Sequence, residues 1–110
     1  MLTLEIDKDL VQVEGIDVNI MGTAFTDRPH AKIAVYAMRK NDDGCWVTDT
    51  YRPIVTIETD LDAEDYYDEW YGFSADTAPG DFPGEVLRFI RPFLYAATVR
   101  QAEEALGVTN

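Results

Sequence analysis

The sequence has one cysteine, one histidine and no long hydrophobic run. With Cys45 alone, no disulfide can form within the chain, so we expect a reducing compartment and a cytoplasmic location. Cys45 and His30 are too few ligands for a zinc or iron site, and we expect no metal and no cofactor. The longest uncharged apolar stretch, residues 92–99, is far shorter than the roughly 20 residues of a membrane-spanning helix. A soluble protein without a membrane contact is therefore predicted.

Lysine and arginine are absent from residues 53–87, although this window holds ten of the 21 acidic residues. The other eleven acids and all nine bases lie elsewhere, so the window contributes −10 to the net charge of −12. Such a field repels nucleic acid and anionic membranes, and it attracts cations and basic protein surfaces. We therefore expect no direct contact with nucleic acid.

The sequence also has no recognisable catalytic motif. Residues 60–71 begin like a calcium-binding loop, but Asp65 stands where an EF-hand needs glycine and Tyr71 stands where it needs a bidentate glutamate. Glycosidase-type pairs of carboxylates need a buried acid, whereas these acids are expected to face solvent. Cys45 and His30 have no third group in the sequence pattern that would orient a nucleophile and its base. We therefore predict that the chain is not an enzyme.

What the sequence does contain is the pattern of a single α+β domain of 110 residues. Alternating apolar side chains predict an antiparallel sheet of five or six strands within residues 2–59. The alternation changes phase at Gly15, which predicts a bulge or a tight turn there. A turn is also expected at residues 7–9, and residues 41–44 predict a hairpin.

Two helices are predicted after the strands. Over residues 61–71 the rings and the carboxylates separate at 100° per residue, which is typical of a short acidic helix that docks its rings on the sheet. In this phase Trp70 belongs to the apolar side, and Gly72 can end the helix. A longer helix over residues 83–106 is expected to bend at Pro92, and both helices are expected to pack on one face of the sheet.

The density of charge on the acidic helix favours one function. From Asp62 to Glu69 a helix rises about 10 Å, so its five carboxylates give about one charge per 2 Å. B-DNA carries about one charge per 1.7 Å of its axis. In charge, size and lack of an active-site motif the chain resembles small DNA-mimic proteins, such as phage-type anti-defence inhibitors of restriction or CRISPR systems.

We therefore predict a non-enzymatic inhibitor or adaptor that binds a basic surface of another protein, one that handles nucleic acid. The acids of the segment supply the field, and two tyrosines at the edges of the apolar side supply anchoring contacts. The expected partner-binding residues are Asp62, Glu64, Asp65, Tyr67, Asp68, Glu69, Tyr71, Asp76 and Asp81.

Two alternatives from other functional classes remain open at this point. In the first, the acidity serves only solubility or salt adaptation, although such charge should spread over the whole surface rather than gather in one segment. In the second, the chain binds a small ligand or acts as an enzyme through a pocket between the sheet and the helices. That alternative places Cys45 or His30 beside an acid in a concave, partly buried site.

Overall fold

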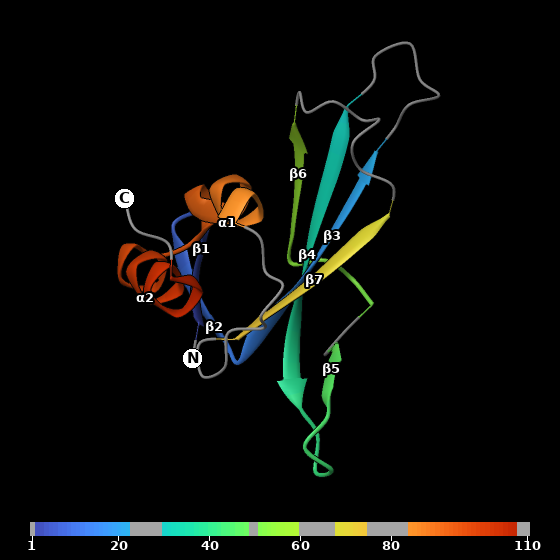
Figure 1. The fold of residues 1–110 in the computed structure, drawn as a ribbon, viewed down its shortest axis with the longest axis vertical. Helices are drawn as coiled ribbons and strands as arrows, with labels where there is room; N and C mark the ends of the chain where they lie inside the picture. The colour runs from blue at the N-terminus through green and yellow to red at the C-terminus, as the bar shows by residue number, and fades with distance from the viewer. Residues whose placement is uncertain (1, 23–29, 49–50, 60–67, 75–83, 108–110) are drawn as a thin grey trace.

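The computed structural model describes residues 2–22, 30–48, 51–59, 68–74 and 84–107, and these residues form an α+β fold (Figure 1). The strands are β1 (Leu2–Ile6), β2 (Asp9–Val13), β3 (Gly15–Gly22), β4 (Ala31–Lys40), β5 (Trp46–Thr48), β6 (Val55–Thr59) and β7 (Glu69–Ser74). The helices are α1 (Gly84–Ile90), a short 3-10 helix η2 (Arg91–Phe93) and α2 (Ala96–Leu106).

The strands form two antiparallel sheets, not the single sheet that the alternation predicted. β1 and β2 pair with each other as a hairpin. In the second sheet β3 lies between β7 and β4, and the other edge of β4 pairs with β6 along its first half and with β5 near its end. The second sheet therefore has five strands, and one of them, β7, comes from the part of the chain where a helix was expected.

Both predicted hairpin turns are present. Asp7 and Lys8 join β1 to β2 with φ values of 50° and 71°, which is the backbone of a two-residue turn that matches the twist of its strands. In the β4–β5 loop the Asn41 side chain accepts backbone N–H groups at 2.9 and 3.0 Å, and Gly44 has a φ of 80°. The local turn chemistry therefore decides where these two hairpins close.

The predicted change of phase at Gly15 marks the junction between the two sheets. Glu14 is a bend between β2 and β3, and Gly15 itself is buried. A Cβ atom on Gly15 would lie 2.8 Å from the backbone oxygen of Phe73 and 3.1 Å from the ring of Trp46. Glycine is therefore required at position 15 because β7 and the Trp46 ring approach the backbone closely. The φ of Gly15 is not in the left-handed region, so backbone conformation is not the reason.

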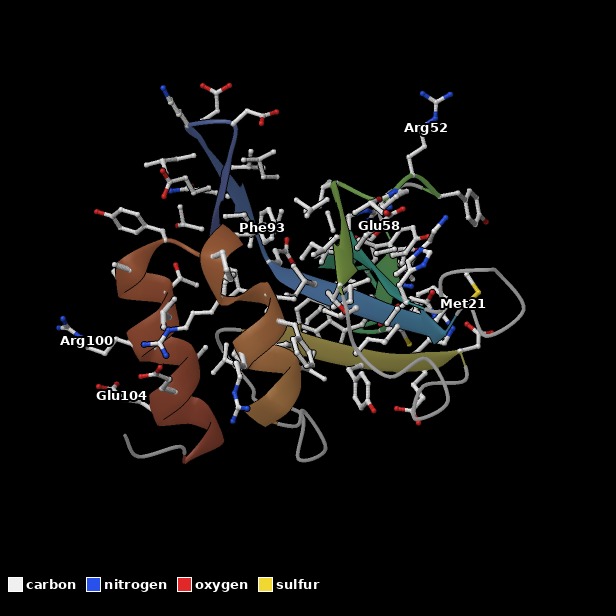
Figure 2. The ribbon with its side chains drawn as sticks, turned by 90° about the horizontal axis from the view of Figure 1, so that it is seen from above. Met21, Arg52, Glu58, Phe93, Arg100 and Glu104 are labelled. Carbon is white, nitrogen blue, oxygen red and sulfur yellow. The ribbon has the colours of Figure 1, made fainter. Side chains whose placement is uncertain are left out.

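The core lies between the inner face of the five-stranded sheet, the hairpin and the helices. We define the inner face as the side that carries Ile16, Val18 and Ile20 of β3, whereas Asp17, Asn19 and Met21 lie on the other side. Figures 1 and 2 show the hairpin, α1 and α2 together on one side of the molecule. The core residues are Leu2, Leu4, Val13, Ile16, Val18, Ile20, Ala31, Ile33, Val35, Val55, Phe73, Val86, Leu87, Ile90, Leu94, Val99 and Ala102.

The helix predicted over residues 83–106 is divided at Pro92, where the bend was expected. Pro92 lies in η2, and the chain is extended at Tyr95 before α2 begins. The backbone N–H of Tyr95 donates to the carbonyl of Thr3 at 3.1 Å, and the N–H of Thr3 donates to the hydroxyl of Thr98 at 3.2 Å. The break thus allows the helical region to satisfy hydrogen-bonding groups along β1. Among the described helices, none has the length and apolar character needed to cross a bilayer.

The acidic helix predicted over residues 61–71 is wrong in its described part. From Glu69 onward the chain is strand β7, antiparallel to β3, whereas residues 60–67 lie outside the described residues. Strand geometry places Trp70 and Gly72 on the side opposite to Tyr71. Aromatic residues favour strands, and pairing with β3 satisfies backbone groups of both segments, so the non-local partner outweighs the helical spacing of the rings.

Candidate functional site

The outer face of the five-stranded sheet is the side opposite to the inner face. None of the described helices covers it, since α1 and α2 lie with the hairpin on the core side (Figure 2). Three of the five large apolar side chains that are exposed among the described residues lie on or beside this face: Met21 (45% exposed), Trp70 (52%) and Tyr51 (97%). Exposed apolar groups gathered on one polar-rimmed face are typical of an interaction site.

A pocket of about 320 Å³ opens on the outer face. The described residues that line it are Asp17 on β3, Tyr36 on β4, Thr48 on β5, Trp70 on β7, and Tyr51, which precedes β6 and lies in no strand. Asp17 and Tyr36 are directly opposite each other in the β3–β4 register, and the ring centroids of Tyr36 and Trp70 are 5.6 Å apart with planes inclined at 37°. Of the described residues, neighbouring strands bring one carboxylate and two aromatic rings around a single hollow, and the segment before β6 adds the ring of Tyr51. We call this hollow the Asp17 pocket.

The Asp17 side chain is half-buried, and it lines the same pocket as the rings of Tyr36 and Trp70. Burial raises the pKa of Asp17 above its ordinary value, because the charged form loses hydration in this setting. No Lys, Arg or His is among the described residues that line the pocket, and no described side chain forms an ion pair or hydrogen bond with this carboxylate. The other titratable groups among the described lining residues are the phenols of Tyr36 and Tyr51. Asp17 is thus a carboxylate that has lost hydration without gaining a partner among the described residues.

The two lysines on the outer face, in contrast, already have partners. Lys32 Nζ lies 3.9 Å from Glu58 Oε1, directly across the β4–β6 pair. Lys40 Nζ lies 5.3 Å from the centroid of the Trp46 ring, which is a cation–π contact. Asp17 lies on β3 between these two ends of the face and has no such partner among the described residues.

Three of the nine predicted partner-binding residues are described, and none of them lines the pocket. Asp68 is exposed, has a φ of 50° and accepts a hydrogen bond from Asn19 Nδ2 at 2.8 Å. Glu69 and Tyr71 are brought together, since the Tyr71 hydroxyl donates to Glu69. Both lie on the inner-face side, where Glu69 pairs with Ile20 and Tyr71 pairs with Val18 across the β3–β7 register. Tyr71 also packs against the core. The other six lie outside the described residues: Asp62, Glu64, Asp65, Tyr67, Asp76 and Asp81.

The residues of the Asp17 pocket were missed by the sequence analysis. Asp17 and Tyr36 stand at the outward positions of alternating strands, where a polar residue is ordinary and an aromatic ring is the informative exception. With the helical spacing of 100° per residue, Trp70 was predicted to lie on the buried side. The two-residue alternation of a strand would have placed it on the exposed side. The signal that was available is the recurrence of aromatic residues at outward-facing strand positions, in particular Tyr36.

A second pocket, of about 460 Å³, lies beside the turn of the β1–β2 hairpin. It mixes acids with a lysine and has no aromatic cluster, so its composition indicates no particular ligand. Its described lining residues are Glu5, Ile6, Asp7, Lys8, Ile54, Val55, Thr56, Pro92 and Phe93.

Cys45 and His30 line neither of these pockets. Cys45 is exposed in the β4–β5 loop, and His30 Nε2 lies 4.0 Å from Glu58 Oε1. In the part of the chain that the structure describes, no group of three or more His, Cys, Asp or Glu side chains is arranged to hold a metal ion.

No protein-family model, no curated protein and no solved structure matches this chain. Its function is therefore inferred from the geometry and charge of its own residues.

Proposed function

We propose that the chain is a non-enzymatic binding protein that docks the outer face of its sheet onto a basic surface of another protein. The observation that carries this proposal is the Asp17 pocket, in which a carboxylate with no partner among the described residues lies beside exposed rings, on a face that none of the described helices covers. Strands β6 and β7, the two described strands of the acidic segment of residues 53–87, belong to this sheet, so the charge of these strands and the rings of the face act on the same partner.

The two features have different roles in binding. A net charge of −12 steers a basic partner toward the protein and raises the association rate. The exposed rings of Tyr51 and Trp70 supply area that can be buried, and such aromatic residues commonly carry most of the binding energy of an interface. A face kept acidic only for solubility has no use for exposed rings, and this distinguishes the proposal from the alternative of a merely solvated surface.

The partner class that fits the charge is a protein that handles nucleic acid. Such proteins neutralise phosphates with exposed lysine and arginine, so their binding surfaces are basic. A chain that occupies this surface competes with the nucleic acid and acts as an inhibitor. Glu69 of β7 does not contribute to the proposed DNA-like row of charge on a helix, because it lies in a strand and bonds to Tyr71.

The salt dependence of binding tests the proposed function. The probe is an alternating Arg-Gly peptide of about ten residues, and an alternating Glu-Gly peptide is the control. We expect the dissociation constant for the Arg-Gly peptide, measured by isothermal titration calorimetry, to rise at least tenfold between about 50 mM and about 500 mM NaCl, because salt screens charges that are more than a Debye length apart. An affinity that does not change with salt, or equal affinity for the two peptides, contradicts the proposal.

A further inference from the structure

We propose that the Asp17 pocket receives the guanidinium group of one arginine side chain of the basic partner. This inference rests on the proposed function and adds the identity of the bound group and the residues that hold it. The residues are Asp17, Tyr36, Thr48, Tyr51 and Trp70.

The size of the pocket fits the end of one side chain. Its volume of about 320 Å³ is close to the lower limit of small-molecule sites, which span roughly 300–1,000 Å³. No basic residue is among the described residues of the lining, so nothing that the structure describes already occupies the place of a cation. A single planar cation can enter here while the rest of the partner remains on the surrounding face.

The state of the carboxylate favours guanidinium over ammonium. Asp17 is already half-buried in the free protein, so part of the cost of removing its water precedes binding. Guanidinium is more weakly hydrated than ammonium and forms two parallel hydrogen bonds with one carboxylate. An arginine therefore loses less hydration than a lysine on entering the pocket, and it gains the bidentate geometry.

The rings and the hydroxyl complete the site. Arginine stacks on aromatic faces, and Trp70 remains 52% exposed while it contacts Tyr36 at a tilt. The same face already holds one cation on a ring, because Lys40 lies over Trp46. Thr48, which lines the pocket, offers a hydroxyl oxygen as an acceptor for the N–H groups that the carboxylate leaves unused. Tyr51, 97% exposed, has nearly all of its surface available for burial against the bound side chain.

Small cations of equal size test the assignment without the rest of a partner. We compare ethylguanidinium, ethylammonium and neutral N-ethylurea at constant ionic strength and follow the indole N–H of Trp70 by NMR. Ethylguanidinium is expected to bind saturably in the low-millimolar range and at least threefold more tightly than ethylammonium, while N-ethylurea gives no saturable shift. Equal or tighter binding of ethylammonium, or no saturable shift with ethylguanidinium, overturns the proposal.

Two variants separate the pocket from general charge attraction. Asp17→Asn removes the pocket carboxylate, and Asp42→Asn removes one exposed charge in the β4–β5 loop. Asp17→Asn should raise the dissociation constant of ethylguanidinium at least tenfold, whereas Asp42→Asn should change this constant less than twofold. Equal effects of the two variants refute the pocket. Trp70→Ala, at an exposed position, is a second test and should weaken ethylguanidinium at least threefold; retained affinity counts against the ring contact.

The failure of this inference can be told apart from the failure of the proposed function. If the Arg-Gly peptide binds in a salt-dependent manner and Asp17→Asn and Asp42→Asn weaken it equally, the pocket assignment is wrong and the proposed function stands. If the peptide does not bind at about 50 mM NaCl, the proposed function fails, and the ethylguanidinium titration still decides whether the pocket holds a cation.

Discussion

Gly15→Ala is expected to lower the free energy of unfolding by about 2–3 kcal/mol, within the range typical of overpacked sites. The added Cβ would lie 2.8 Å from the backbone oxygen of Phe73, and a backbone atom inside a five-stranded sheet cannot move aside as the end of a flexible side chain can. The added Cβ would also lie 3.1 Å from the ring of Trp46, so it cannot shift toward that ring to avoid Phe73. The substitution therefore separates β7 from β3 or tilts Trp46 out of its place. Urea unfolding followed by circular dichroism measures the effect.

Gly72→Ala is the matched control for this prediction. Gly72 also lies in the five-stranded sheet, but a Cβ on it would meet nothing within 4 Å and its φ is not in the left-handed region. Its replacement should leave stability unchanged or raise it by about 0.4–1 kcal/mol, since alanine reduces the entropy of the unfolded chain. If the two variants have the same stability, the close approach of β7 and Trp46 to Gly15 is not present in solution.

Asp17→Asn is expected to move binding and stability in opposite directions. Loss of the carboxylate should weaken the Arg-Gly peptide by about 1.4 kcal/mol or more, a factor of at least ten, because close interfacial charge pairs couple by about 1.5 kcal/mol or more. The same change should leave the free energy of unfolding equal or higher, because it removes a half-buried charge that has no described partner. A residue that costs stability and serves binding is expected at a functional surface.

The stability difference between Asp17→Asn and the unchanged protein is expected to depend on pH. The pKa of Asp17 is raised in the folded protein, so the folded state binds more protons than the unfolded state in the window between the two pKa values. The contribution of Asp17 to stability therefore falls as the pH rises through its folded pKa, and the cost is complete above it. The advantage of Asp17→Asn should appear above that pKa and vanish at strongly acidic pH. A variant less stable at neutral pH would show that the carboxylate has a stabilising partner, and an advantage that is independent of pH would show that ionisation of Asp17 is not what costs stability.

Features set by neighbours in sequence were predictable. The turn at Asp7 and Lys8, the hairpin at residues 41–44 and the change of phase at Gly15 depend on local backbone demands or on alternation. The break at Pro92 follows from the missing N–H and the ring of proline. Helix α2 ends at Leu106, as the predicted range of residues 83–106 has it, and Gly107 after it has a φ of 69°, the left-handed conformation that glycine adopts readily.

Strand β7 was not predictable in the same way. The spacing of its rings with the earlier tyrosines matches a helix, and nothing near it in sequence opposes that reading. The decisive contact is with β3, about 50 residues earlier in the chain, where Val18 lies opposite Tyr71 and Asn19 lies opposite Trp70. Strand preference depends on the partner and on burial more than on the residue itself, so tertiary pairing overrides the local period. The division into two sheets depends on the same kind of non-local contact.

The Asp17 pocket was hidden for a related reason. Its lining residues are spread from Asp17 to Trp70 and become neighbours only when β3, β4, β5 and β7 are ordered side by side. The most conspicuous feature of the sequence is the acidity of residues 53–87, and Asp17 lies outside that window. Correct strand order was thus needed before Asp17 and its surrounding rings could be recognised as one site.

The most direct test of the central claim, that the outer face of the sheet is the docking surface, is a map of backbone amide shifts during titration with the Arg-Gly peptide at about 50 mM NaCl. The largest changes should fall on β3, β4 and β7 and on the indole N–H of Trp70. The exposed side of α2, where Figure 2 shows Arg100 and Glu104 pointing away from the sheet, should change little. Shifts of equal size at Glu104 and at the pocket, or a map centred on the helices, would contradict the account.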